Sequence, residues 1–145
     1  MNGKKARHYF ETGYLCAESV LLAGADILEI NNPAIPAMAT AFCSGTSRTR
    51  GTCGAYQGAV LLISILHGRS NSGQDLDFCY GLVQDLTEWF RNNYGTTDCL
   101  QITGCDFSLN SGRKKFKEEG IKVSTCYPLV DNTTEFVTKL LKENS

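Results

Sequence analysis

The sequence predicts an all-α protein, a single-domain bundle of six or seven helices. Its 145 residues suit one hydrophobic core. Apolar side chains make up 42% of the chain, a share that argues against disorder. These side chains recur at helical spacing in several segments, and no stretch alternates polar and apolar residues over the length of a strand. We therefore expect residues 1–145 to form one helical domain.

The first half of the chain predicts three helices. Residues 4–23 carry apolar side chains at helical spacing, and Gly24 is expected to end this helix. Pro36 is expected to open a short second helix, because proline is tolerated in a first turn. Residues 43–52 predict a polar loop that contains glycine. Residues 53–67 become almost continuously apolar, which predicts a buried third helix.

The second half predicts the remaining helices. A second loop is expected at residues 68–73, followed by the clearest amphipathic pattern of the chain at residues 75–92. Residues 96–100 predict a short helical start. Residues 110–119 predict a charged helix, and residues 128–142 the last helix, which a proline opens.

Two glycines of the third predicted helix lie on one face. Gly54 and Gly58 are four residues apart, and glycine lowers the stability of a helix interior. Such a pair is expected where another backbone approaches closely. The neighbouring backbone belongs either to this chain or to a partner in a homodimer.

The charge balance gives no support to nucleic-acid or membrane binding. Fourteen basic and fifteen acidic residues leave a net charge of −1, so no global positive field is expected. The N-terminus is basic but lacks the apolar core of a secretory signal. The most apolar run, residues 59–66, is far shorter than the ~20 residues of a membrane span. We expect a cytoplasmic protein.

Cysteine is the unusual feature of the composition. The odd number of cysteines, without a signal peptide, favours redox or metal-binding thiols over a disulfide scaffold. Packing in the core is the alternative for any single cysteine. The seven cysteines are Cys16, Cys43, Cys53, Cys79, Cys99, Cys105 and Cys126.

Three of these cysteines are expected near helix starts. Cys53, Cys99 and Cys126 each precede or open a predicted helix, where unpaired N–H groups and the helix dipole favour a thiolate. Asp98 is expected to oppose this effect beside Cys99. Cys16 falls in the middle of the first predicted helix, where core packing is the simplest expectation.

The cysteine spacing excludes several common sites. No Cys-x-x-Cys pair occurs, so the signatures of zinc ribbons and thioredoxin-like proteins are missing. No Cys-x-x-Cys-His occurs, so we expect no covalent haem. His8 and His67 lie away from the cysteine segments. A site of four sulfur atoms would have to be assembled by the tertiary fold.

Four segments together resemble a known family. Residues 53–58, Cys-Gly-Ala-Tyr-Gln-Gly, match a Cys-Gly-Ala-x-x-Gly box. Residues 14–20 are similar to an Asn-Cys-Ser-x-Ala-Val segment, and residues 98–104 to a Cys-x-x-Leu-x-Gly segment. Residues 126–130 are similar to a Cys-Pro-x-x-Val segment, offset by one residue at the proline. In order and spacing they resemble the family of redox-active proteins named for its C-GCAxxG-C-C cysteine pattern.

The resemblance implies a helical bacterial or archaeal domain with four characteristic cysteines. The family is similar to a domain of the split-Soret cytochromes, which implies electron transfer or an iron–sulfur cluster. Its members are often encoded near transporters, which implies a transporter-linked partner. The four cysteines correspond here to Cys16, Cys53, Cys99 and Cys126.

This chain departs from the family pattern. Cys43 stands where the family loop usually has glycine, and Thr52 stands where it usually has glutamate. Cys79 and Cys105 are additional cysteines. The three extra thiols imply either that the cysteine site is modified or expanded, or that these cysteines only pack in the core.

Three functions remain open from the sequence. The first is an iron–sulfur or other metal–thiolate site for electron transfer, held by the four motif cysteines. The second is a metal-free thiol–disulfide protein in which Cys53 attacks and Cys99 or Cys126 resolves. In it, Arg48 and Arg50 would stabilise the thiolate, although solvation of a loop explains them as well. The third is a non-catalytic helical interaction module. The redox partner, and whether the protein is an enzyme or an electron carrier, stay open.

Overall fold

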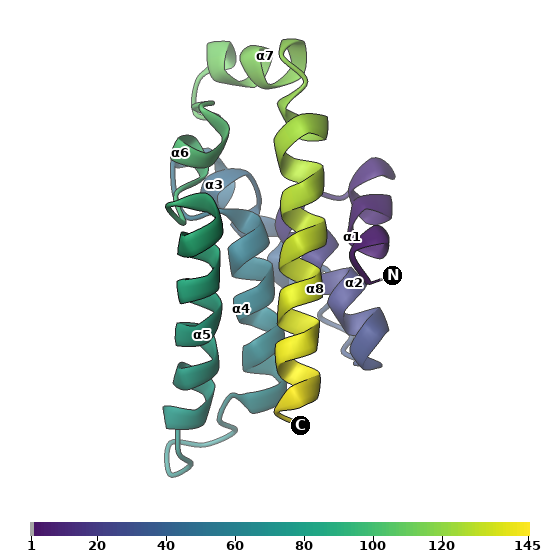
Figure 1. Cartoon of the computed structure of the whole chain (residues 1–145), viewed down its shortest axis with the longest axis vertical. Coiled ribbons are helices and arrows are strands. Elements are labelled where there is room, and N and C mark those ends of the chain that lie inside the picture. Colours follow the sequence, from purple (N-terminus) through teal and green to yellow (C-terminus); the bar gives the residue numbers. More distant parts are fainter. Residues whose placement is uncertain (1) are drawn as a thin grey trace.

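Helices form the whole framework of the chain, as a computed structural model that describes residues 2–145 shows (Figure 1). The prediction of an all-α fold is confirmed, since no β-strand occurs in that range. The elements are α1 (Asn2–Glu11), α2 (Cys16–Leu28), η1 (Ala37–Phe42), α3 (Cys43–Arg48), α4 (Gly54–His67), α5 (Asp77–Tyr94), α6 (Cys99–Thr103), α7 (Asn110–Glu118), η2 (Lys122–Cys126) and α8 (Tyr127–Glu143).

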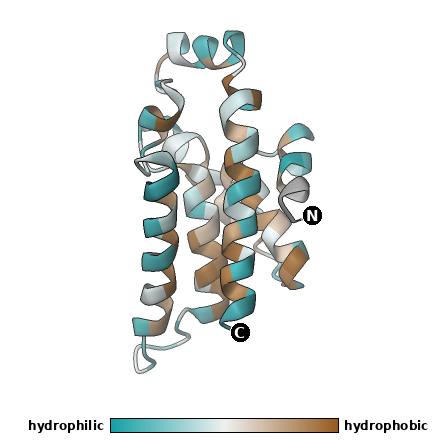
Figure 2. Ribbon diagram, viewed as in Figure 1, coloured by the Kyte–Doolittle hydropathy of each residue, from teal (hydrophilic) through white to brown (hydrophobic). Residues whose placement is uncertain are grey.

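Three long helices, α4, α5 and α8, run side by side along the molecule (Figure 1). α2 packs against α4, and α1 packs against both α8 and α2. The short helix α7 crosses one end, which is the upper end in Figure 1. Hydrophobic residues recur along the helices that form the bundle, as the brown segments of the ribbon show (Figure 2), and burying their side chains is the main source of stability. The largest fully buried side chains include Phe90, Leu21, Leu62, Ile63, Leu86, Leu129 and Leu141.

The single first helix predicted for residues 4–23 is wrong, because two helices replace it. The chain turns at Gly13, whose φ is 116°, a value that side chains disfavour. A new helix then starts because the Leu15 amide donates to the Glu18 carboxylate at 3.0 Å, as in a capping box. This split, together with the short helix α3 in the segment predicted as a polar loop, gives eight α-helices within residues 2–145, while the short helix predicted from Pro36 is the 3-10 helix η1.

Gly24 does not end a helix, contrary to the prediction. It lies inside α2, and a Cβ there would overlap the side chain of Leu62 on α4. The helix ends four residues later, at Leu28, where Glu29 adopts a left-handed conformation with φ of 56°. Close packing between α2 and α4, and not helix termination, is therefore what this glycine provides.

The close approach predicted at the paired glycines of α4 is confirmed within this chain. A Cβ on Gly58 would lie 2.7 Å from the backbone oxygen of Ala17 on α2, and one on Gly54 would overlap the sulfur of Cys16. This glycine face is therefore buried against α2 and cannot serve as a surface for dimerisation.

The helices predicted after residue 52 are all present, with shifted boundaries. α5 ends at Tyr94 and is followed by Gly95, which has a φ of 76°, and Gly120, with a φ of 64°, lies just after α7. The last helix begins at Tyr127 and follows directly from a π-helical turn, η2. None of the helices within residues 2–145 is long and apolar enough to span a membrane.

Candidate functional site

The four motif cysteines lie at or beside helix starts. Cys16 is the first residue of α2, Cys53 directly precedes α4, and Cys99 is the first residue of α6. The predicted position of Cys16 in mid-helix is wrong, because the break at Gly13 lets α2 begin at this cysteine. Cys126 ends η2, which continues into α8. π-Helical turns of this kind are frequent at functional sites.

An isolated antiparallel bridge brings Cys53 next to Cys99. The bridge joins the residues that immediately precede the two cysteines. The Cys53 amide donates to the Thr97 carbonyl at 2.7 Å, and the Cys99 amide donates to the Gly51 carbonyl at 3.1 Å. The starts of α4 and α6 are thereby held together, although they come from distant parts of the sequence.

The loop before the bridge contains a left-handed turn. The four residues that follow Cys43 in α3 (Cys43–Arg48) have φ values between 56° and 64°, and such a conformation costs roughly 1–2 kcal/mol for each residue with a side chain. Gly45 belongs to this turn. A Cβ on it would lie only 3.0 Å from the Cβ of Cys99. The Ser47 hydroxyl holds the turn by donating to the Ala41 carbonyl at 2.8 Å.

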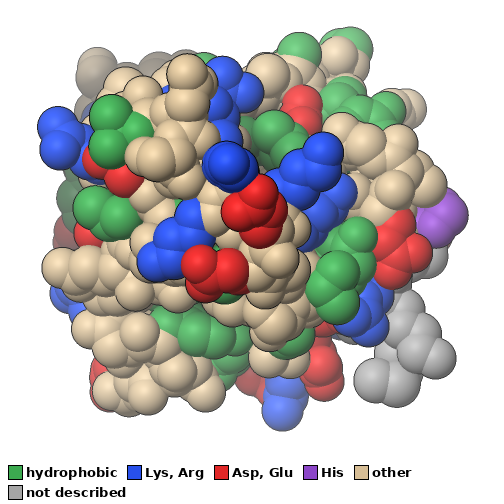
Figure 3. Space-filling model, turned by 90° about the horizontal axis from the view of Figure 1, so that it is seen from above, with side chains coloured by type: hydrophobic (Ala, Val, Ile, Leu, Met, Phe, Trp, Pro, Cys, Tyr) green, Lys and Arg blue, Asp and Glu red, His purple; other side chains and the backbone are tan. Residues whose placement is uncertain are grey.

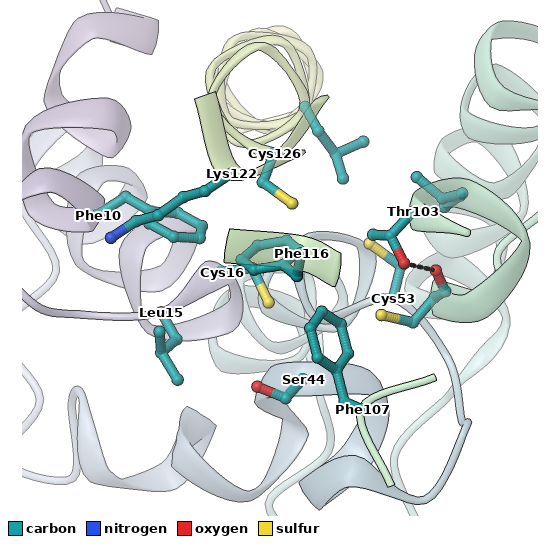
Figure 4. A pocket seen from close by; sticks show the side chains of 13 residues that line it. Phe10, Leu15, Cys16, Ser44, Cys53, Thr103, Phe107, Phe116, Lys122 and Cys126 are labelled. Carbon is teal, nitrogen blue, oxygen red and sulfur yellow. Dashed lines mark hydrogen bonds between the residues drawn. The ribbon is translucent and has the colours of Figure 1, made fainter. Parts of the chain in front are cut away.

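The four motif cysteines line one cavity, as Figure 4 illustrates for Cys16, Cys53 and Cys126. Its volume is about 150 Å³, enough for about five water molecules. It lies at the end of the bundle that α7 crosses. The remaining lining side chains are mostly apolar: Phe10, Leu15, Ser44, Ile102, Thr103, Phe107, Phe116, Lys122 and Leu129.

Aromatic rings close part of this cavity. Phe107 precedes α7 and Phe116 lies on it, and their rings meet edge to face with centroids 5.0 Å apart. Lys122 places its amine over the ring of Phe10, 5.3 Å from the centroid. α1 and the distant segment that contains α7 and η2 therefore supply a wall around the thiols.

Burial controls the acidity of three of the thiols. It raises the pKa of Cys53 and Cys126 to about 12 and that of Cys99 to about 11. The backbone amide of Tyr56 lowers the pKa of Cys53 but does not outweigh burial. The expectation that its helix start makes Cys53 an acidic attacking thiol is therefore wrong. Asp98 raises the pKa of Cys99 further, as predicted.

The extra cysteines occupy three different environments. Cys43 is buried beside Cys16, and the hydrogen bond between the two side chains is the main cause that raises the pKa of Cys43. Cys105 is buried just behind Cys99, where Thr103 donates to the carbonyls of both. Cys79 lies on α5 and packs into the apolar core. Two of the three extra thiols thus adjoin the motif cysteines.

The basic residues near this end do not form a surface of one sign. The outer face at this end carries Lys and Arg side chains with Asp and Glu among them (Figure 3). On α7, Lys114 pairs with Glu118 at 3.8 Å. Arg48 and Arg50 are both exposed, as expected for residues of a solvated loop.

No three or more Cys, His, Asp or Glu side chains of the described residues converge closely enough to hold a single metal ion. His67 is remote from the cavity, at the end of α4, where its ring contacts Phe78. The four motif thiols thus line a common cavity, and among the described residues they do not form such a single-ion site.

Sequence reasoning missed the apolar wall of the cavity. Phe107, Phe116 and Lys122 carry no motif, and their role depends on how α7 folds over the end of the bundle. It also missed the contact between Cys16 and Cys43, because a single helix over residues 4–23 hides the helix start at which they meet.

One comparison with known proteins gives a match. A family model described as "Putative redox-active protein (C_GCAxxG_C_C)" matches residues 14–140. No curated protein and no solved structure matches the chain. The matched segment covers all four cysteines of the cavity.

Proposed function

Because the chain belongs to this family of redox-active proteins, we propose that it is an electron carrier that holds an iron–sulfur cluster on Cys16, Cys53, Cys99 and Cys126. Four cysteine thiolates are the usual ligands of such clusters. One observation carries the proposal: these four thiols line a single apolar cavity.

The cavity suits a compact inorganic group. Protein interiors contain few voids larger than a water molecule, so a space of about 150 Å³ amid a close-packed bundle is unusual. Pockets for organic ligands commonly measure about 300–1,000 Å³, about twice this volume or more. An apolar wall that carries four thiols is also the donor set that iron–sulfur clusters use.

A cluster fits the arrangement better than a single ion. In a four-cysteine zinc site each sulfur lies about 2.3 Å from the metal, so no two sulfur atoms are more than about 4.6 Å apart. Here a cavity separates the thiols. A cluster places its ligating sulfur atoms on different irons, so it needs such a space between them.

The surrounding residues would shield and tune the site. When bound, the cluster supplies one-electron transfer, with a potential set by charge, hydrogen bonds and solvent exposure. Phe107 and Phe116 exclude water from the cavity. The charge of Lys122 favours the thiolate of Cys126 and partly offsets the negative charge of four thiolates.

Iron and sulfide content tests the proposal. We expect the chain purified without oxygen to contain stoichiometric iron and acid-labile sulfide, with a visible charge-transfer spectrum. Cys53→Ser is expected to lose most of both. Cys79→Ser is the matched control, because it also removes a buried thiol, one that does not line the cavity, and it should keep the wild-type content.

Three results would contradict the proposal of an iron–sulfur cluster. They are stoichiometric zinc without sulfide, no metal after anaerobic purification and reconstitution, or equal iron in the Cys53→Ser and Cys79→Ser variants. A metal-free disulfide protein is the second candidate, favoured by the proximity of three motif thiols: Cys99 raises the pKa of Cys53, and Cys53 and Cys99 both raise the pKa of Cys126. A disulfide between Cys53 and either of the other two, in a chain without iron, would support it.

We also propose a cellular compartment and a redox partner for the chain. A cluster of this kind implies a cytoplasmic or otherwise reducing compartment and a redox partner, for which a transporter-linked protein is one candidate. Whether the chain acts as an enzyme or only as a carrier depends on that partner. Co-purification from anaerobic extract, followed by cluster reduction with the isolated partner, tests this extension.

A further inference from the structure

Three of the motif cysteines face the cavity but are closed off from solvent. Cys53, Cys99 and Cys126 are each at most 7% exposed. For a solute to reach all of these thiols, part of the cavity wall has to move. The element of the wall that is held least firmly is therefore the expected entrance.

The elements of the wall differ in how they are held. α1 packs against α2 and α8, and η2 packs against α8. α7, by contrast, packs extensively against no other helix of the described part of the chain, and it crosses the end of the bundle as a separate short helix (Figure 1). Residues 106–119, which we call the α7 segment, are tied to the other described residues by a single side-chain hydrogen bond. In it, the Lys115 amine donates to the Gly104 carbonyl at 3.0 Å.

The α7 segment is held together internally. The Arg113 guanidinium donates to the Phe107 carbonyl, and the Phe107 and Phe116 rings pack against each other with centroids 5.0 Å apart. Gly112 lies directly on the backbone of Asp106, where a Cβ would overlap the carbonyl group. The segment would therefore move as one body and carry both cavity-lining rings with it (Figure 4).

A glycine in the left-handed conformation lies at each end of the α7 segment. Gly104 has a φ of 70° and Gly120 a φ of 64°. Glycine adopts positive and negative φ values about equally readily, so the backbone can change direction at both points. The segment thus has a pivot at each end and little packing between the two.

We propose that the α7 segment is a lid that swings open as one body about Gly104 and Gly120 and admits iron and sulfide ions to the motif thiols. Opening withdraws Phe107 and Phe116 from the cavity and breaks the hydrogen bond of Lys115. Active-site lids and loops commonly control access in this way. The admission of iron and sulfide rests on the proposed function, whereas the opening itself requires no cluster.

Thiol alkylation of the reduced, metal-free full chain tests the lid. The chain is treated with iodoacetamide for increasing times, quenched with excess thiol, digested and analysed by peptide mass. Lys115→Met removes the hydrogen bond to Gly104 from an exposed position but keeps a long, helix-forming side chain. Cys53 and Cys126 should then react roughly two- to tenfold faster than in wild type, as expected for the loss of one hydrogen bond.

Lys114→Met is the matched control. Lys114 is the preceding residue of the same helix, it is also exposed, and it pairs with Glu118 of α7 at 3.8 Å. Its replacement should leave the alkylation rates of the motif cysteines at the wild-type values. Cys79, which is buried on α5 and does not line the cavity, should react at the same rate in wild type and in both variants.

Two outcomes overturn the lid. One is an equal alkylation rate of Cys53 and Cys126 in the Lys115→Met and Lys114→Met variants. The other is a rate in wild type that rises with urea as steeply as global unfolding does, by about fivefold or more for each molar of urea. Because lid opening exposes little surface, the rate should depend only weakly on urea at low concentration.

Iron content separates the lid from the proposed function. Both lysine variants should bind as much iron as wild type, and Lys115→Met should take it up faster during reconstitution. The expected alkylation rates in a chain that never binds iron would contradict the cluster alone. Iron binding in a chain whose two lysine variants are alkylated equally fast would contradict the lid alone.

Discussion

The two ends of the helical bundle differ in how their interiors are filled. At the packed end, where the far halves of α4, α5 and α8 meet, buried aliphatic side chains such as Leu62, Ile63 and Leu141 fill the interior. At the sulfur end, formed by α3, α6, η2 and the starts of α2 and α4, a cavity of about 150 Å³ replaces this packing. The backbone there also adopts a left-handed turn.

The difference between the two ends indicates which part of the molecule stabilises the fold and which part carries the chemistry. Close packing gives the packed end the contacts that stabilise the fold. A cavity and left-handed residues lower stability, and proteins keep such features mainly at functional sites. Stability of the chain should therefore depend most on the packed end, and chemistry on the sulfur end.

The largest loss of stability is expected from a substitution at the packed end. Leu62→Ala removes a fully buried side chain that touches Gly24, so unfolding free energy should fall by about 2–5 kcal/mol in urea titrations. Leu66→Ala, one turn further along α4, is the control, because Leu66 is 42% exposed, and should change stability by less than about 1 kcal/mol. Equal losses would contradict the comparison.

The next largest change in stability is expected where α2 and α4 pack closely together. In Gly58→Ala the added methyl group would lie 2.7 Å from the Ala17 carbonyl oxygen, and the resulting overpacking should cost about 1–3 kcal/mol. Gly81→Ala is the matched control in α5, where a Cβ meets nothing within 4 Å. It should stabilise the chain by about 0.5–1 kcal/mol through helix propensity. Thermal melts of the pair should shift in opposite directions.

Strain in the left-handed turn at the sulfur end predicts that a substitution relieving it raises the stability of the fold. Thr46 is β-branched and has a φ of 56°, so Thr46→Gly should stabilise the chain by about 1 kcal/mol. Thr12→Gly is the control at an exposed position outside the left-handed region, and should destabilise by a few tenths to about 1 kcal/mol. If urea unfolding finds Thr46→Gly less stable than wild type, the left-handed turn is not strained.

The smallest effect lies on the surface beside α1. The Tyr9 hydroxyl donates to the Asp26 carboxylate, and this hydrogen bond raises the pKa of Tyr9 to about 12. Because the folded state favours the protonated phenol, its contribution is complete below pH 10 and is lost as the pH rises towards 12. The stability difference between wild type and Tyr9→Phe should shrink over that window. A difference that stays constant from pH 9 to pH 11.5 would rule out this linkage.

The fold class, most of the helices and the four motif cysteines could be predicted from local patterns in the amino-acid sequence. Helical spacing of apolar residues is a local pattern, so α4, α5, α7 and α8 could be predicted with boundaries shifted by a few residues. Cysteine segments in a fixed order sufficed to identify the family.

The way in which those cysteines come together depends on contacts between distant parts of the folded chain. The break at Gly13 lets α1 and α2 pack against each other and both against α8, and the bridge beside Cys53 and Cys99 pairs segments distant in sequence. Burial, which raises the pKa values of these thiols, is likewise set by what α7 covers. Contacts between distant segments leave no periodic or local pattern in the sequence, and for this reason the cavity and the Cys16–Cys43 contact became visible only in the folded chain.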